Sequence, residues 1–182
     1  MKRKNILAIS GSTRSHSTNE SILKIIAELF RESLDVQFFS IAELPHFNPD
    51  LDKEEVPLSV KSFRELINHA DGILICTPEY VFSLPGALKN AIEWTVSTTV
   101  FSDKPAALIV ASSMGEKAME SLNLIMKTLG AKIDGNTLLI SGARAKVNKQ
   151  GEMETGALAE IKALMNSFER SLTTIDNTLP VK

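Results

Sequence analysis

The sequence predicts an α/β protein built on an open, doubly wound parallel sheet. Strand-like apolar segments alternate with amphipathic helix-like segments along the chain, which is the pattern of such sheets. Two strand-like segments, residues 72–76 and 106–111, are continuously apolar, as expected of strands covered on both faces. The length of 182 residues suits one domain with a substantial core.

Each predicted element follows from its hydrophobic period. Apolar runs and alternation predict five strands, at residues 4–10, 35–40, 72–76, 106–111 and within 132–140. Apolar residues spaced by three and four predict five helices, at residues 19–33, 60–67, 85–95, 119–129 and 158–172. Pro85 suits a helix start, and Gly130 is expected as a C-cap.

The remaining segments are expected to be loops. Residues 41–57 carry several prolines and acids and are too polar for the core, and residues 142–156 form a second polar loop. We expect a single domain over residues 1–176, followed by a short tail at 177–182.

Composition narrows the class of function. The net charge of −2 provides no overall field for nucleic acid or a membrane surface, and no apolar run approaches the roughly 20 residues of a membrane span. The N-terminal segment is expected to be a strand and not a signal peptide, so we expect a cytoplasmic protein. Cys76, the only cysteine, is expected to be an inert core thiol. His46 and His69 lack partners at metal-ligand spacing.

Residues 11–19 join the first strand to the first helix and carry the clearest functional signal. They hold one glycine, several hydroxyls and Arg14, and they contain no acid. Unpaired N–H groups at a helix start bind anions, and a guanidinium fits a phosphate monoester, so we interpret the loop as a phosphate cradle. Ser17 and Glu20 also fit a capping box, which alone predicts only a helix start. The loop matches neither common nucleotide-binding motif.

Two further polar stretches follow strands, at residues 77–86 and 112–115. Ligands of open parallel sheets bind at the carboxyl ends of the strands where the strand order reverses. We expect a five-stranded parallel sheet with the strand order 2-1-3-4-5, in which all three loops would surround one site. Tyr80 and Phe82 could stack on a flat heteroaromatic ring or simply pack at a helix entry. Residues 112–115 could approach a ligand closely or form an ordinary strand-to-helix turn.

Two motifs resemble those of the NADPH-dependent FMN reductase family, flavodoxin-like flavoproteins that include chromate, quinone and azo reductases. The first family signature, roughly G-S-x-R-x-x-S-x-N, matches residues 11–19. The second, roughly P-E-Y-N-x-x-x-P-G-x-L-K-N-A-I-(D/E)-W, matches residues 78–94 and is long and specific. With a further match near residues 48–51, the resemblance covers about residues 5–140.

The resemblance implies three groups of cofactor-binding residues and no catalytic side chain. It implies that the FMN phosphate is held by Ser12, Arg14, Ser17, Thr18 and Asn19. It implies that the isoalloxazine is lined, largely through backbone, by Pro78, Glu79, Tyr80 and Val81. It implies that the pyrimidine side of the ring meets Ser112, Ser113, Met114 and Gly115.

The sequence departs from the family pattern in two places. Val81 stands where the family usually has asparagine, which removes a side-chain hydrogen-bonding group near the flavin. The glycine pair common after the fourth strand is missing, since Glu116 and Lys117 follow Gly115. Both departures bear on the side of the site expected to receive the nicotinamide.

The resemblance implies an NAD(P)H-dependent oxidoreductase in which hydride passes from a reduced nicotinamide to flavin N5 and on to a small acceptor. The expected acceptors are a quinone, an azo compound, a metal oxyanion or free flavin. The family also implies a homodimer or homotetramer in which a partner chain helps cover the flavin. Two alternatives stay open: a non-enzymatic FMN electron carrier, and a binding protein for another phosphorylated ligand. The weak net charge disfavours a docking carrier.

Overall fold

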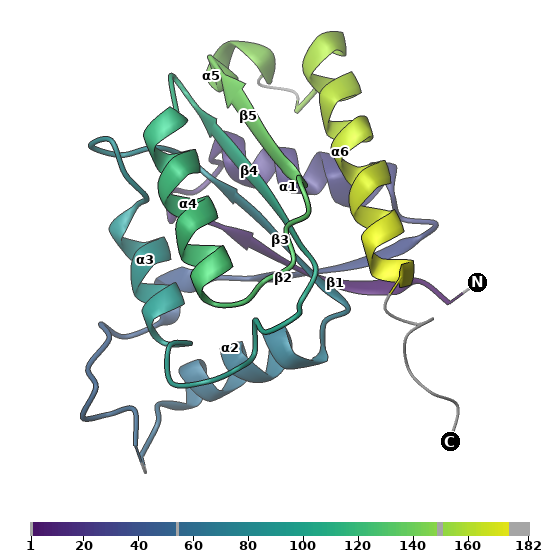
Figure 1. Cartoon of the computed structure of the whole chain (residues 1–182). Helices are drawn as coiled ribbons and strands as arrows, with labels where there is room; N and C mark the ends of the chain where they lie inside the picture. Colours follow the sequence, from purple (N-terminus) through teal and green to yellow (C-terminus); the bar gives the residue numbers. More distant parts are fainter. Residues whose placement is uncertain (1, 54, 149–150, 175–182) are drawn as a thin grey trace.

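The computed structural model describes residues 2–53, 55–148 and 151–174. Five parallel strands form one sheet in the order β2-β1-β3-β4-β5, as predicted (Figure 1). The strands span Lys4–Ser10 (β1), Leu34–Phe39 (β2), Gly72–Thr77 (β3), Ala106–Ser112 (β4) and Thr137–Ser141 (β5). The strand order reverses next to β1, so the carboxyl ends of β1, β3 and β4 lie side by side at one edge.

Helices cover both faces of the sheet. The α-helices span Thr18–Leu29 (α1), Leu58–His69 (α2), Gly86–Glu93 (α3), Glu116–Thr128 (α4), Ala143–Lys146 (α5) and Thr155–Thr174 (α6). A short 3-10 helix, η1, spans Ile41–Glu43. In Figure 1, α2, α3 and α4 lie on one face, whereas α1 and α6 lie on the other. Within the described ranges, no helix has both the length and the apolar character needed to cross a bilayer.

Successive side chains of the central strands pack alternately into two separate hydrophobic cores, one on each face of the sheet. Ile73 and Ile75 of β3 pack with α2, α3 and α4, whereas Leu74 and Cys76 pack with α1 and α6. This two-sided burial explains why β3 and β4 read as continuous apolar runs in the sequence.

Some predicted boundaries and loops were wrong. The first helix ends at Leu29, four residues before the predicted end at Ser33. Residues 142–156 are not one loop, because α5 and the start of α6 lie within them. Gly130 does lie just after α4, with a φ of 80°. The predicted tail at residues 177–182 lies outside the described residues.

The connection at residues 41–57 was expected to stay out of the core, but part of it is buried. Ile41 and Leu44 are buried against the α2–α3 face. The carbonyl oxygen of Pro45 accepts hydrogen bonds from Asn90 Nδ2 at 2.9 Å and from Trp94 Nε1 at 2.8 Å. Both donors belong to the second sequence signature, and Trp94 is fully buried. This half of the signature therefore secures the fold within one chain and does not contact the site.

Gly11 allows the loop after β1 to approach the end of β3. A Cβ atom at position 11 would lie 2.1 Å from Thr77 Oγ1 and 2.5 Å from Thr77 Cβ. The Gly11 N–H also donates to the carbonyl oxygen of Cys76 at 2.8 Å. Thr77 is fully buried, so it has no free space into which to move. The absence of a side chain at position 11 therefore sets the spacing of two of the three loops.

Replacing Gly11 by alanine is expected to destabilise the protein by about 3 kcal/mol, because a new methyl group must displace buried atoms. Thermal unfolding of the variant measures this loss. Gly86→Ala is the matched control, since a Cβ atom there would meet nothing within 4 Å and Gly86 lies in a helix. The control is expected to be neutral or slightly stabilising. Equal melting temperatures for Gly11→Ala and the wild type would contradict this interpretation.

Candidate functional site

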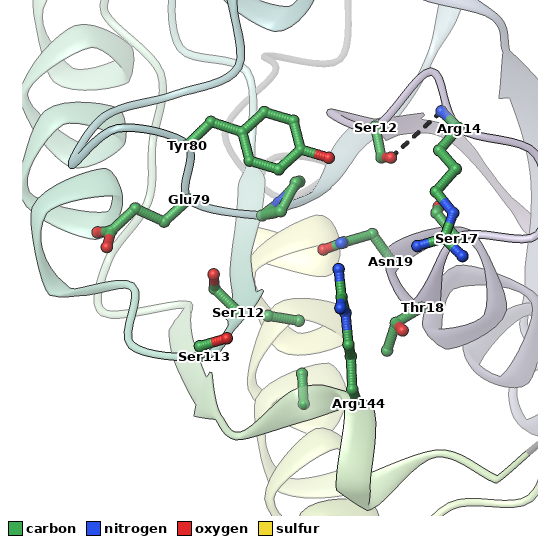
Figure 2. Close-up of a pocket in the computed structure, with 13 residues that line it drawn as sticks. Ser12, Arg14, Ser17, Thr18, Asn19, Glu79, Tyr80, Ser112, Ser113 and Arg144 are labelled. Carbon is green, nitrogen blue, oxygen red and sulfur yellow. Dashed lines mark hydrogen bonds between the residues drawn. The ribbon is translucent and has the colours of Figure 1, made fainter.

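A pocket opens at the carboxyl edge of the sheet, between the loops that follow β1, β3 and β4 (Figure 2). Its empty volume, which includes space open to solvent, is about 540 Å³. The residues that line it are Ser12, Arg14, Ser17, Thr18, Asn19, Pro78, Glu79, Tyr80, Ala111, Ser112, Ser113, Ala143 and Arg144. The three polar stretches that the sequence singled out therefore do converge on one site.

Ten of the thirteen residues selected from the sequence line this pocket. Val81, Met114 and Gly115 do not. Val81 is almost fully exposed on the turn beyond Tyr80, and Met114 is half exposed. Three pocket residues were not selected, namely Ala111, Ala143 and Arg144.

The N-terminal end of α1 forms one wall of the pocket. Ser17 is its N-cap, and its Oγ accepts the N–H of Glu20 at 3.1 Å. Glu20 does not complete a reciprocal capping box, because its carboxylate pairs with Lys24 at 2.5 Å. The backbone N–H groups of Thr18 and Asn19 have no acceptor within the described residues. Ser17 therefore both starts the helix and lines the pocket, so the two sequence interpretations are compatible.

Cys76 holds the Asn19 side chain in one orientation. The Cys76 thiol donates to Asn19 Oδ1 at 3.3 Å from the end of β3. The amide nitrogen of Asn19 is left without an acceptor in the described part of the chain and belongs to the pocket wall. Burial raises the pKa of the Cys76 thiol far above its ordinary value, so the group stays protonated. The thiol is buried as predicted, but it also supports the site.

Arg14 extends from the loop after β1 and brings a positive charge to the α1 end of the pocket (Figure 2). Its backbone N–H donates to Ser12 Oγ at 3.3 Å, which shapes the loop. Its guanidinium forms no hydrogen bond or ion pair with any described residue. A free guanidinium beside free backbone N–H groups is the donor set that phosphate recognition requires.

Glu79 links the loops after β3 and β4. Its Oε2 accepts the N–H of Ala118, in the first turn of α4, at 2.9 Å. A carboxylate at a helix start satisfies an unpaired N–H group and opposes the positive end of the helix dipole. Glu79 is thus a helix cap that fixes the relative position of two pocket walls.

The turn at residues 80–83 has an unusual backbone. Tyr80 and Ser83 exchange two backbone hydrogen bonds of 3.0 Å, which closes a two-residue turn. Its central residues, Val81 and Phe82, have φ values of 50° and 55°. This left-handed region favours glycine or asparagine and is costly for a β-branched residue. The family's usual asparagine at position 81 would suit this backbone, whereas Val81 strains it.

Gly115 is needed where the β4 loop enters α4. Its φ of 121° lies outside the normal range of other residues. A Cβ atom there would lie 2.6 Å from Leu139 Cδ1 and 2.8 Å from Val110 Cγ1. Gly115 therefore contributes by shaping the loop that carries Ser112 and Ser113 and not by lining the pocket.

Val81→Asn is expected to stabilise the protein by about 1 kcal/mol, or roughly 2–4 °C in Tm, because asparagine tolerates the left-handed backbone. Val81 is 95% exposed, so the change loses almost no buried contact. Thermal unfolding monitored by circular dichroism provides the measurement. Val81→Ala is the control, because it shortens the side chain without relieving the left-handed preference. An equal gain for both variants would mean that removing an exposed apolar side chain, and not relieving the backbone, is responsible.

Glu79→Ala is expected to lower the free energy of unfolding by about 1–2 kcal/mol, because the first turn of α4 loses its cap. Glu79→Gln keeps an acceptor and is expected to lose about half as much. Chemical denaturation measures both. Glu120→Ala, an exposed change on the same helix, is expected to lie within about 0.5 kcal/mol of the wild type. If Glu79→Ala behaves like that control, the cap does not stabilise α4.

Arg144 is the principal pocket residue that the sequence did not reveal. It lies in α5, a helix of four residues that follows Gly142. Four residues give no hydrophobic period, and a lone arginine in a polar segment carries no signal of its own. Only the position of β5 beside β4 brings Arg144 to the site.

Three charged residues line the pocket, and two of them are arginines. Two guanidinium groups stand against one carboxylate, that of Glu79, so the pocket walls carry an excess of positive charge. No cluster of His, Cys, Asp and Glu side chains among the described residues is arranged to hold a metal ion. The charge of the pocket walls therefore suits an anionic ligand.

Fold and site together define a flavodoxin-like protein with a pocket at its topological switch point. An archaeal flavodoxin superposes with a TM-score of 0.60 over 93% of this chain and 99% of its own, at 11% identity, which supports the fold alone. FerB from Paracoccus denitrificans, described as a flavoenzyme NAD(P)H:(acceptor) oxidoreductase, superposes with a TM-score of 0.75 at 26% identity. That superposition covers 94% of this chain and 98% of FerB.

Sequence comparison gives the particular family. Residues 4–145 match the NADPH-dependent FMN reductase family. A quinone reductase of Escherichia coli K12 is 32% identical over 90% of this chain and 92% of its own length. The CrdA subunit of an NADH:(hydroxy)cinnamate reductase from Vibrio ruber is 32% identical over 90% of this chain and 85% of its own. The chain belongs to the NADPH-dependent FMN reductase family, which confirms the resemblance seen in the motifs. Its class is therefore that of oxidoreductases that use FMN with NADPH or NADH.

Proposed function

We propose that this protein is an FMN-dependent NAD(P)H oxidoreductase that passes hydride from a reduced nicotinamide to flavin N5 and on to a small acceptor. The observation that carries the proposal is the electropositive pocket, in which a free guanidinium and free N–H groups stand at one end. The segments at residues 78–80 and 112–113 line the other end. This division matches the two chemical parts of FMN, a charged phosphate and a flat ring.

The pocket residues fit this cofactor by their donor chemistry. Ser12, Arg14, Ser17, Thr18 and Asn19 would hold the phosphate, since they supply hydroxyls, an amide, N–H groups and a charge at a helix N-terminus. The ring would lie along Pro78, Glu79, Tyr80, Ser112 and Ser113, which line the pocket. Val81, Met114 and Gly115 do not line it, and they would contribute only through the backbone of the adjoining turns. No side chain of the pocket is assigned a catalytic role.

FMN, when bound, supplies the hydride-accepting atom, so the protein's part is to bind and orient. Glu79 and Gly115 hold the loops after β3 and β4 in a fixed relation through α4. Arg14 and the start of α1 provide positive potential at one end of the pocket, which would stabilise negative charge on the bound group.

The acceptor proposed is a quinone, an azo compound, a metal oxyanion or free flavin. The name of the Escherichia coli relative, quinone reductase, supports a quinone among these. Tyr80, Val81, Phe82 and Met114 leave apolar surface exposed beside the pocket, which is consistent with a partner copy covering the flavin in a homodimer or homotetramer. We also propose that residues 1–176 form one FMN-binding domain with a short tail, and that the protein works in the cytoplasm.

The visible absorption spectrum tests the proposed function. Protein loaded with FMN and freed of excess is expected to show flavin bands that bleach when NADPH or NADH is added without oxygen. Adding a quinone to the bleached protein is expected to restore the bands. The reduction rate with each nucleotide, followed by stopped flow, gives the preferred reductant.

The alternative functions predict different spectra. Flavin bands that NADPH and NADH both leave unchanged would favour a non-enzymatic FMN electron carrier. A protein that takes up no flavin would overturn the proposal and favour a site for another phosphorylated ligand.

A further inference from the structure

The pocket contains a second guanidinium that neither the sequence motifs nor the family signatures include. Arg144 lines the same pocket as Arg14, but Arg14 follows the inner strand β1, whereas Arg144 follows the edge strand β5. In Figure 2 its side chain rises from α5 toward Asn19, between Ser112 on one side and Thr18 on the other. The two arginines thus approach the N-terminal end of α1 from different directions.

The backbone around Arg144 is fixed at both ends. Gly142 turns the chain with a φ of 65°, and its N–H donates to the Ser113 carbonyl oxygen at 3.2 Å. Ala143 is 1% exposed and packs into the core that α1 and α6 share. On the far side, the Lys146 carbonyl oxygen accepts the N–H of Glu154 at 2.8 Å. Arg144 is therefore attached to a fixed support at the pocket wall.

The Arg144 guanidinium has no intrachain function that would explain its direction. It forms no hydrogen bond or ion pair with any residue in the described ranges. The carboxylate that lines the pocket, Glu79, is turned to Ala118 of α4. Two guanidinium groups match the charge of a phosphate monoester, which carries about −1.5 to −2 at pH 7.

We propose that Arg144 is a second phosphate-binding arm, which with Arg14 holds the phosphate of FMN from two sides at the start of α1. The inference rests on the proposed function, because it names a residue of the same cofactor site. It assigns to α5 a role in selecting FMN over riboflavin, which has the same ring and no phosphate. Arginine suits this role because its planar fork donates two parallel hydrogen bonds.

Binding of FMN and of riboflavin to flavin-free protein, measured by fluorescence titration at fixed ionic strength, separates the phosphate contact from ring contacts. Arg144→Gln is expected to raise the Kd for FMN about ten- to a hundredfold, as for loss of a charge-assisted hydrogen bond, and to leave the Kd for riboflavin unchanged. The Kd of Arg144→Lys for FMN is expected to lie between those of the wild type and Arg144→Gln, since lysine keeps the charge but lacks the planar guanidinium.

Lys146→Gln is the matched control. It removes one positive charge from the same short helix at a residue that does not line the pocket, so it reports the effect of net charge alone. The control is expected to bind FMN and riboflavin as the wild type does. An FMN affinity that falls equally in Lys146→Gln and Arg144→Gln would overturn the inference.

Other outcomes locate the error. If Arg144→Gln weakens the binding of FMN and of riboflavin equally, the arginine contacts the ring. If the variant binds FMN as the wild type does, the arginine does not contact FMN. If Arg144→Gln leaves FMN binding unchanged but raises the KM for NADPH more than the KM for NADH, the arginine binds the phosphate that distinguishes NADPH from NADH. Each of these results contradicts the inference while leaving the proposed function intact. A wild-type protein that binds neither flavin would overturn both.

Discussion

The site depends on the close contact between Gly11 and Thr77. Two neighbouring strands must end at the same level for their loops to share a pocket. Here the backbone at Gly11 lies so close to Thr77 that there is no room for a Cβ atom at position 11. The same contact places the start of α1 beside the end of β3, where Cys76 reaches Asn19. The third loop is then positioned from the second, because Glu79 caps α4. One missing side chain thus determines the arrangement of three segments that are far apart in the sequence.

The second signature serves two purposes in one stretch of chain. Its first part lines the pocket, with Glu79 joined to α4 and Tyr80 beginning the left-handed turn. Its last part, with Asn90 and Trp94, holds the long connection at Pro45. A motif that recurs in a family therefore need not consist of ligand-binding residues only. Contacts of buried polar atoms distinguish the two roles, since a buried donor must find a partner within the protein.

The sequence was sufficient for the strand order and for most of the pocket. Continuous apolar runs such as β3 are typical of strands buried on both faces, and topology then brings their loops together. The sequence was insufficient where burial or position depends on contacts between residues that are far apart in the sequence. Ile41 and Leu44 are buried in a segment whose prolines and acids suggested solvent exposure. Arg144 lies at the site only because β5 pairs with β4. The sequence around α5, a helix of four residues, has no local pattern that would predict this.

The hydrogen bond from Cys76 to Asn19 also bears on chemical durability. Oxidants such as peroxides attack the thiolate, and burial keeps this sulfur both protonated and shielded from solvent. It is the only sulfhydryl in the chain, so there is no second thiol with which it could form an internal disulfide. The thiol that orients the Asn19 amide is therefore one that oxidants reach poorly. The geometry around Asn19 is therefore expected to persist under oxidising conditions that modify exposed thiols.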